Sequence, residues 1–339
     1  MRAMPTRPLR HSAAGLAALG LLTLAGAAAL GACAATLDLR YCDRDADCQR
    51  FSADGPLRCD VPSGVCMTAT CDGHDECAAL GDGFVCGLKN LCVDALVGGC
   101  EFAVLPGGEV KDPMVVVGAI IDRGAPVGDA TLAAMRLAVE DFNAKATLAD
   151  GSRVALLACD GEGTAAGARD AAEHLVTKVG VPALLGPGED DAVLTVGEKV
   201  SVVSGNNVFT MTPTAAAPIG IADPTTLLWR ATPSTPFQGQ AIQDRVADLK
   251  PATAVLLFRN DLYGISLFDG ATVVDEMGNW VLPGVPQQSN LSYTSAAEAI
   301  AAYDTLLGVI PDPDVLVVLG GDEAGEILGH IAASGTIPP

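Results

Sequence analysis

The chain has 339 residues, of which 50% are hydrophobic and 18% are charged, so it has ample apolar material for packed cores and no sign of global disorder. Its formal net charge of −21 excludes nucleic acid as a partner, because binding phosphates requires clusters of Lys and Arg. Aromatic residues make up only 4%, which argues against a surface that stacks bases or sugars.

The first 32 residues have the organisation of a secretory signal. A basic start precedes the apolar run Ala13–Ala32, which contains only Ala, Gly, Leu and one Thr. The run ends in Leu-Gly-Ala-Cys, which resembles the bacterial lipobox. We therefore expect residues 1–32 to be a signal peptide, Cys33 to be lipid-modified, and residues 33–41 to tether an exported protein to the cell envelope, facing the periplasm or the exterior. A plain signal peptide cleaved nearby and an uncleaved anchor are the alternatives.

Residues 42–100 contain two tandem cysteine-rich repeats. Each has four cysteines on one plan, with five residues between the first two and a longer polar loop before the third. The cysteines are Cys42, Cys48, Cys59 and Cys66 in the first repeat and Cys71, Cys77, Cys86 and Cys92 in the second. Such density predicts disulfides and an oxidising compartment, and three pairings per repeat remain open. A metal site is disfavoured because no C-x-x-C spacing occurs, and we expect a spacer or a protein-contact element.

Two cysteines remain outside the repeats and the lipobox. Cys100 precedes the first predicted strand of the main domain, and Cys159 ends the second. Because those strands should be neighbours in a doubly wound sheet, we expect a disulfide between the two cysteines. Residues 101–112 are predicted to be a linker.

From residue 113 onward, apolar runs of strand length alternate with Gly-containing turns and segments of helical period. The predicted strands are Met114–Ile121, Val154–Ala158, Val181–Leu185, Val208–Met211, Thr253–Phe258 and Val315–Leu319, and Leu227–Arg230 leads into the turn before the second lobe. A helix after the first strand is indicated by an apolar stripe at Leu132, Met135, Val139 and Phe142, with its start near Gly128 and Asp129. Another helix is expected to begin near Gln238.

This rhythm predicts an α/β fold with two doubly wound parallel-sheet lobes. We assign residues 113–234 to lobe 1 and residues 235–339 to an incomplete lobe 2, with one crossing between them near Thr232–Pro236. The small disulfide-rich module precedes both lobes.

No motif for catalysis or for a cofactor stands out. The chain has four His residues and lacks both G-x-S-x-G and H-E-x-x-H, so we expect a protein that is not an enzyme. The segment Gly161-Glu162-Gly163 follows a strand, but its spacing to Gly167 differs from a dinucleotide loop and an acid occupies the phosphate-facing position. We therefore expect no cofactor and no metal.

Residues 113–339 resemble the type 1 periplasmic binding proteins, above all the branched-chain amino-acid and amide receptors of ABC importers. The matching pieces occur in the order that the family shows. They are A-P-V-G, V-E-D-F-N, L-L-G-P, T-P-T-A-A-A-P, W-R-A-T-P-S-T-P-F-Q-G, N-D-L-Y-G and P-D-V-L-V-V-L-G-G. The resemblance implies a two-lobed clamp that closes over a small molecule at the carboxyl ends of the strands, and an ABC permease as partner.

The resemblance also implies ligand-binding positions. In amino-acid-binding members, a hydroxyl residue after G-P and groups after the T-P turn hold the ligand carboxylate, a Tyr covers the ligand, and acidic groups take its ammonium. The residues of this chain at or beside those positions are Glu189, Asp190, Thr212, Thr214, Tyr263 and Asp322, with Glu323 as an alternative to Asp322.

Two positions depart from the pattern. Acidic residues, Glu189, Asp190 and Asp191, stand where a hydroxyl residue is usual, and Ala216 replaces the usual Thr after the T-P turn. Carboxylates at a helix start repel a ligand carboxylate. We therefore expect that the clamp does not bind simple aliphatic amino acids with the usual contacts. It would take a cationic or neutral ligand, such as an amide, or none, in which case the protein would be an interaction or sensor lipoprotein of the cell envelope.

The family's clamp crosses its hinge three times, whereas this chain shows a single crossing. The resemblance therefore implies that about a third of the domain is missing. Either the sequence is part of a longer chain, which we expect, or the lineage has lost binding.

Overall fold

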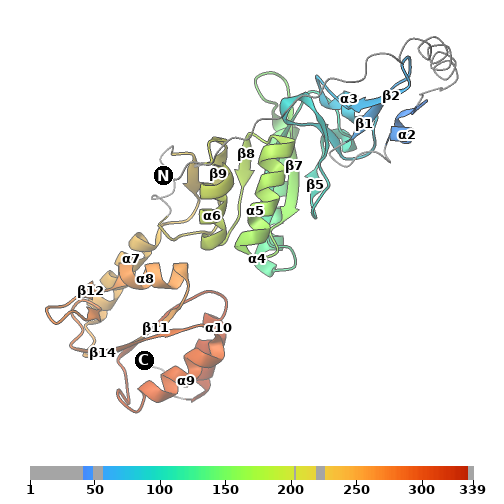
Figure 1. The fold of residues 1–339 in the computed structure, drawn as a ribbon. Coiled ribbons are helices and arrows are strands. Elements are labelled where there is room, and N and C mark those ends of the chain that lie inside the picture. The colour runs from blue at the N-terminus through green and yellow to red at the C-terminus, as the bar shows by residue number, and fades with distance from the viewer. Residues whose placement is uncertain (1–40, 49–55, 202–203, 219–225, 335–339) are drawn as a thin grey trace, which may run out of the picture. The chain divides into compact units, whose positions relative to one another are not determined.

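The computed structural model describes residues 41–48, 56–201, 204–218 and 226–334 (Figure 1). The predicted signal peptide, Cys33 and almost all of the tether lie outside these ranges. Among the described helices, none has the length and apolar character needed to cross a membrane. The chain divides into two compact units, one built on the first cysteine repeat up to Met67 and the other essentially from Thr68 onward.

The first unit is a small knot held by cysteines. It contains helix α2 (Asp45–Cys48) and the two-stranded sheet of β1 (Leu57–Asp60) and β2 (Val65–Thr68). Disulfides Cys42–Cys59 and Cys48–Cys66 supply most of its buried side chains, as expected for a segment with too little apolar material for a core.

The second repeat has the same disulfide order as the first. Its bridges are Cys71–Cys86 and Cys77–Cys92, and its elements are α3 (His74–Ala78), β3 (Phe84–Cys86), η2 (Leu88–Asn90) and β4 (Cys92–Asp94).

This second repeat packs directly on lobe 1. Val85 and Ala95 are fully buried in the same core as the lobe 1 sheet, and the Nε2 atom of His174 lies 3.2 Å from the carbonyl oxygen of Ala95. The second repeat therefore extends the main domain and is not a detached spacer.

Lobe 1 contains a six-stranded sheet in the order β10-β9-β8-β6-β7-β5. Its strands are β5 (Glu101–Val104), β6 (Met114–Ile121), β7 (Arg153–Asp160), β8 (Ala183–Leu185), β9 (Phe209–Thr212) and β10 (Leu228–Arg230). All neighbours are parallel except β5, which runs antiparallel to β7. As the sequence suggested, β6 and β7 are neighbours, and the structure contains the disulfide Cys100–Cys159.

The predicted linker at residues 101–112 was wrong in one respect, because it contains β5 and the short helix η3 (Pro106–Gly108). β5 has only four residues, and their sequence, Glu-Phe-Ala-Val, carries too short an alternation to be recognised as a strand.

Helices cover both faces of the lobe 1 sheet. On one face, α4 (Pro126–Lys145) packs Leu132, Met135 and Val139 against the sheet, as the predicted stripe required. On the other face lie α5 (Ala165–Glu173) with its continuation η4 (His174–Val179), and α6 (Asp190–Val196) with η5 (Gly197–Ser201). The sheet is doubly wound, which confirms the predicted fold class for this lobe.

Lobe 2 is built on the parallel sheet β14-β11-β15. Its elements are α7 (Thr235–Leu249), β11 (Thr253–Arg259), α8 (Leu262–Ala271), β12 (Val273–Val274), β13 (Trp280–Val281), β14 (Gln287–Tyr293), α9 (Ala296–Leu306), β15 (Val315–Leu319) and α10 (Ala324–Ser334). Alternate residues of β11 face opposite cores: Val255 and Leu257 contact the α9 side, and Ala254 and Leu256 the α8 side.

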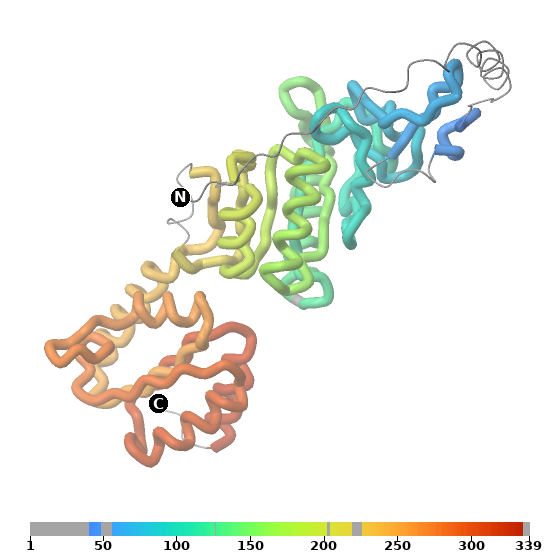
Figure 2. Tube along the Cα trace, viewed as in Figure 1, coloured from blue at the N-terminus to red at the C-terminus, as the bar shows by residue number. Residues whose placement is uncertain are grey.

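The backbone passes from lobe 1 into lobe 2 between β10 and α7 (Figure 2). Two helices begin earlier than predicted. Both α4 and α7 have a proline in the first turn. Backbone N–H groups there have no partner within the helix, so proline loses no hydrogen bond, and its fixed φ favours the helix.

Candidate functional site

The carboxyl ends of the lobe 1 strands surround a pocket that opens to solvent. The loops after β6, β7, β8 and β9 all contribute to its lining. Open parallel sheets bind ligands at this edge because the loops diverge there and leave room between them. The apolar part of the lining includes Ile120, Ala125 and Ala192, and hydroxyl groups come from Thr131, Thr164 and Thr214.

Among the described residues that line the pocket, the charged ones are two acids, Asp122 and Glu189. Glu189 is the N-cap residue of α6. Loss of hydration raises the pKa of its carboxyl. The positive charge of Arg259 acts to lower that pKa, and the negative charge of Asp190 acts to raise it. The pocket therefore has a negative wall.

Hydrogen bonds join the loop after β8 to the loop after β9. The hydroxyl of Thr212 donates to the carbonyl oxygen of Pro187 at 2.8 Å, and the hydroxyl of Thr214 donates to that of Gly188 at 2.9 Å. Thr212 is fully buried, so its role is to hold the two loops together. Thr214 lies at the pocket surface.

Asp190 makes the third connection between these loops. Its Oδ1 atom accepts the backbone N–H of Ala217 at 2.8 Å, and the residue is 8% exposed. Burial raises the pKa of this carboxyl, while the N–H groups of Ala217 and Ala216 act to lower it. The nearby Arg230 donates to the carbonyl oxygen of Ala216 at 2.8 Å, which fixes the loop from its other side.

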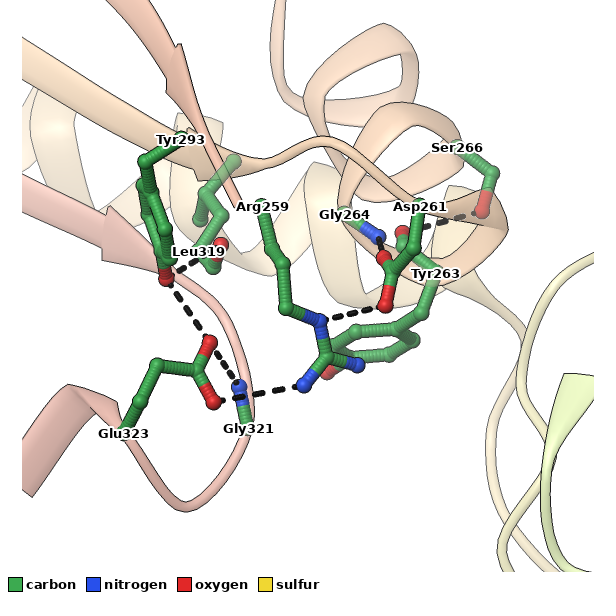
Figure 3. A network of polar contacts seen from close by, with 9 residues as sticks. All are labelled: Arg259, Asp261, Tyr263, Gly264, Ser266, Tyr293, Leu319, Gly321 and Glu323. Carbon is green, nitrogen blue, oxygen red and sulfur yellow. Dashed lines mark hydrogen bonds and ion pairs between the residues drawn. The ribbon is translucent and has the colours of Figure 1, made fainter. Parts of the chain in front are cut away.

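Lobe 2 has a polar network at the carboxyl ends of its own strands (Figure 3). The guanidinium of Arg259, the last residue of β11, pairs through Nε with Asp261 and through Nη1 with Glu323 at 3.3 Å. Burial disfavours the charged guanidinium, but the two carboxylates outweigh that effect and raise the pKa of Arg259. Asp261 also caps α8 by accepting the N–H of Gly264 at 2.7 Å.

Glu323 is held by three groups in this network. Its Oε1 atom accepts hydrogen bonds from the hydroxyl of Tyr293 and the N–H of Gly321, both at 3.0 Å. Burial acts to raise the pKa of Glu323, but these bonds and the charge of Arg259 outweigh it and lower the pKa. Burial, with the bond to Glu323, holds the pKa of the Tyr293 hydroxyl far above its usual range.

The structure brings four of the residues selected from the sequence together at the carboxyl ends of β8 and β9 in lobe 1. These are Glu189, Asp190, Thr212 and Thr214. The other two lie in lobe 2. Tyr263 is half-buried and donates from its hydroxyl to the Oε1 atom of Gln238 at 3.0 Å, whereas Asp322 is exposed and its neighbour Glu323 faces the Arg259 network.

The sequence did not single out Asp122 or Arg259. Each stands at the end of an apolar strand, the place where a doubly wound sheet presents side chains to a ligand. A search for polar residues directly at the carboxyl ends of the predicted strands would have identified both Asp122 and Arg259 as candidate site residues.

Comparison with known proteins supplies the family. A family model described as periplasmic binding protein matches residues 115–336, which is well over half of the chain. The chain belongs to this family. Membership confirms the resemblance noted in the sequence and accords with the expectation of a binding protein rather than an enzyme. No curated protein sequence matches the chain.

Several solved structures share the fold. The branched-chain amino acid transporter substrate binding protein LivJ from Streptococcus pneumoniae, solved in complex with isoleucine, is 23% identical with a TM-score of 0.56, over 67% of this chain and 63% of that one. The leucine binding protein LivK from Thermotoga maritima is 18% identical with a TM-score of 0.54, over 66% and 61%.

An ABC transporter substrate-binding protein from Desulfitobacterium hafniense is 17% identical, with a TM-score of 0.50 over 67% of this chain and 65% of that chain. The present chain thus spans less than two thirds of each of these structures.

Proposed function

We propose that this protein is an extracytoplasmic solute-binding component of an ABC importer, and that it captures a small molecule at the carboxyl edge of the lobe 1 sheet. The observation that carries the proposal is the pocket formed by the loops after β6, β7, β8 and β9 in a chain of the periplasmic-binding-protein family. A preformed apolar pocket with a few polar groups is what small-molecule sites in α/β folds require.

The chemistry of the lining favours a ligand with an ammonium group and an apolar body. Asp122 and Glu189 would attract a cation, while the aliphatic side chains around them would cover a hydrocarbon group. A ligand carboxylate would face these acids instead. At about 4 Å and an effective dielectric constant of about 20, two like charges repel by roughly 4 kcal/mol, which is enough to reject a carboxylate held next to either acid.

The test uses a pair of ligands that differ in one group. Leucine and 3-methylbutylamine share the same branched hydrocarbon and amine, but only leucine has a carboxylate. In titration calorimetry with the purified full-length protein, the amine should bind and leucine should bind at least about tenfold more weakly. Leucine binding that is as tight as the binding of the amine, or tighter, would overturn the assignment.

Glu189→Gln should weaken binding of the amine, because it removes one charge from the pocket wall. Glu198→Gln provides a control with the same change of charge. Glu198 is exposed in η5, in the same lobe, and does not line the pocket. Equal loss in both variants would point to a general effect of net charge.

The lipid anchor at Cys33 and the location in the cell envelope belong to the same proposal. Importer components of this kind must stay near their permease, and a lipid on the first residue of the mature chain would hold the protein at the membrane. Mass spectrometry of the mature amino terminus would detect the lipid, and Cys33→Ser should release the protein into the soluble fraction. An unmodified amino terminus at another residue would contradict the anchor.

A second candidate is an interaction or sensor lipoprotein in which the cysteine repeats make the contact. It is favoured by the exposure of Tyr41, Val61 and Met67, each 52–53% accessible, on a first repeat that forms its own compact unit. If no amine, amide or amino acid stabilises the protein in a thermal-shift screen, this alternative gains support.

A further inference from the structure

The outer edge of β14 presents backbone groups that no other described strand pairs with. In the described sheet its one neighbour is β11, and the two strands keep an unbroken parallel register over all seven residues. The N–H of Gln287 and the carbonyl oxygen of Tyr293 both bond to the β11 side, so the odd-numbered residues of β14 face β11. Because bonding alternates along a parallel strand, the N–H and C=O groups of Gln288, Asn290 and Ser292 point outward.

This edge is open, and its conformation is fixed by the protein. All residues from 287 to 292 line one surface groove together with Trp280. Successive side chains of a strand point to opposite faces, so a groove that all of these residues line runs along the edge of the strand. The side-chain amides of Gln288 and Asn290 donate to the carbonyl oxygen of Trp280 at 3.0 and 2.7 Å. These bonds tie β14 to β13, and the outward backbone groups are therefore held in place before any partner arrives.

The edge also lacks the features that usually protect a free strand. Natural proteins place charged side chains, proline or a bulge at such an edge, and β14 contains none of these. The whole stretch from Met277 to Ala297 has no charged residue, although the chain has a net charge of −21. Two copies of so acidic a chain repel each other, and that repulsion is weakest where this uncharged stretch is presented.

We propose that the outer edge of β14 is an interface at which a second copy of this chain adds its own β14, so that two three-stranded sheets join into one. A two-fold axis at Asn290 makes the two strands antiparallel. Asn290 then lies opposite its own counterpart, and Gln288 lies opposite the partner's Ser292, so every outward N–H meets an outward C=O. The edge is therefore complementary to itself, which favours a second copy over an unrelated chain. This inference goes beyond solute binding and does not depend on the ligand.

The first measurement is sedimentation equilibrium of the full-length protein, whose mass should rise from monomer to dimer with concentration. Ser292 is exposed, and Ser292→Pro removes one outward N–H without removing a bond to β11. This variant should associate at least about tenfold more weakly, because symmetry makes the dimer lose two hydrogen bonds at once. Ser292→Thr keeps the N–H and should associate as the wild type does. A wild type that stays monomeric, or equal association of the two variants, would overturn the inference.

The second measurement needs no variant, so it does not depend on how well the proline is tolerated. Amide hydrogen exchange is resolved by residue at a low and a high protein concentration. The outward N–H groups of Gln288, Asn290 and Ser292 should exchange more slowly at the high concentration, where the partner strand covers them. Those of Ser289 and Leu291 face β11 and should exchange slowly at both concentrations. A dimer whose outward N–H groups still exchange fast would place the contact on another surface and contradict the inference.

Discussion

The Nη1 atom of Arg259 lies 3.3 Å from the Oε2 atom of Glu323, and this contact joins the end of β11 to the loop after its neighbour β15. The same guanidinium pairs with Asp261, so one cation is shared by two carboxylates and the group keeps one net negative charge (Figure 3). The positive charge of Arg259 thus compensates part of the negative charge at the carboxyl edge of the lobe 2 sheet. The contacts with Arg259, Tyr293 and Gly321 fix the positions of its acid oxygens.

The Arg259–Glu323 pair should make the protein sensitive to acid. The folded pKa of Glu323 is lowered, so its stabilisation is present above the ordinary glutamate pKa of about 4.3 and is lost as pH falls through the folded value. Glu323→Gln should lower the free energy of unfolding by about 0.5–1 kcal/mol at pH 7, the range for a partly exposed pair. Urea unfolding at pH 7, 5 and 3 should show that difference shrinking towards zero.

The matched control for this prediction is Glu326→Gln. Glu326 lies in α10, one turn beyond Glu323, and is exposed. It undergoes the same chemical change without the contact to Arg259. A pH dependence that is equal in the two variants would show that the acid sensitivity arises from net charge alone.

Most of the strands that could be predicted from the sequence are continuous apolar runs. The strands at Met114–Ile121 and Val315–Leu319 have the predicted bounds, since a continuous apolar run has no other place in a doubly wound fold. In contrast, β14 reads Gln-Gln-Ser-Asn-Leu-Ser-Tyr, so no apolar pattern marks it. Its pairing with β11 is a tertiary effect.

The candidate site could be predicted only in outline. The sequence identified Glu189 and Asp190 as acids at the start of a helix. It did not show that their side chains lie in opposite environments. Glu189 faces solvent at the pocket, whereas Asp190 turns to the loop after β9 and is buried. That difference depends on side-chain direction around one turn of backbone, which a sequence pattern does not encode. The pairing of Arg259 with Glu323 spans 64 residues and is equally hidden.

The contact between α7 and α8 should depend on a glycine. A Cβ added to Gly239 would lie 2.2 Å from the carbonyl carbon of Gly270 and 2.6 Å from the nitrogen of Ala271, so the two helices would have to separate. Gly239→Ala should therefore reduce the free energy of unfolding by about 1–3 kcal/mol. The measurement is urea unfolding followed by circular dichroism.

Gly329→Ala is the control for that change, because a Cβ at Gly329 in α10 meets no atom within 4 Å. It should raise stability by about 0.5–1 kcal/mol through the entropy of the unfolded chain. If the two alanines had the same effect, close packing at Gly239 would not be the cause.

An asparagine continues the hydrogen bonding of β7 where the short strand β5 stops. The Nδ2 of Asn143 in α4 donates to the carbonyl oxygen of Val154 at 2.7 Å, and its Oδ1 accepts the Val154 N–H at 2.9 Å. Asn143→Ala should destabilise the protein by about 1–2 kcal/mol, since both backbone groups lose a partner. Asn143→Asp should be at least as harmful, because a carboxylate oxygen would face the carbonyl. A neutral effect of both changes in urea unfolding would contradict this role.

The disulfide Cys100–Cys159 should stabilise the main unit, because it joins the residue before β5 to the interior of β7 and closes a loop of 59 residues. Replacing both cysteines by Ala avoids leaving a buried polar group and should lower the free energy of unfolding by about 2–4 kcal/mol.

The matched pair Cys42→Ala with Cys59→Ala removes a bridge from the first repeat, a separate compact unit, and should leave the unfolding of the main unit unchanged. Urea unfolding followed by the fluorescence of Trp229 and Trp280, both in the main unit, distinguishes the two outcomes. Equal destabilisation by the two pairs would mean that the first repeat unfolds together with the lobes.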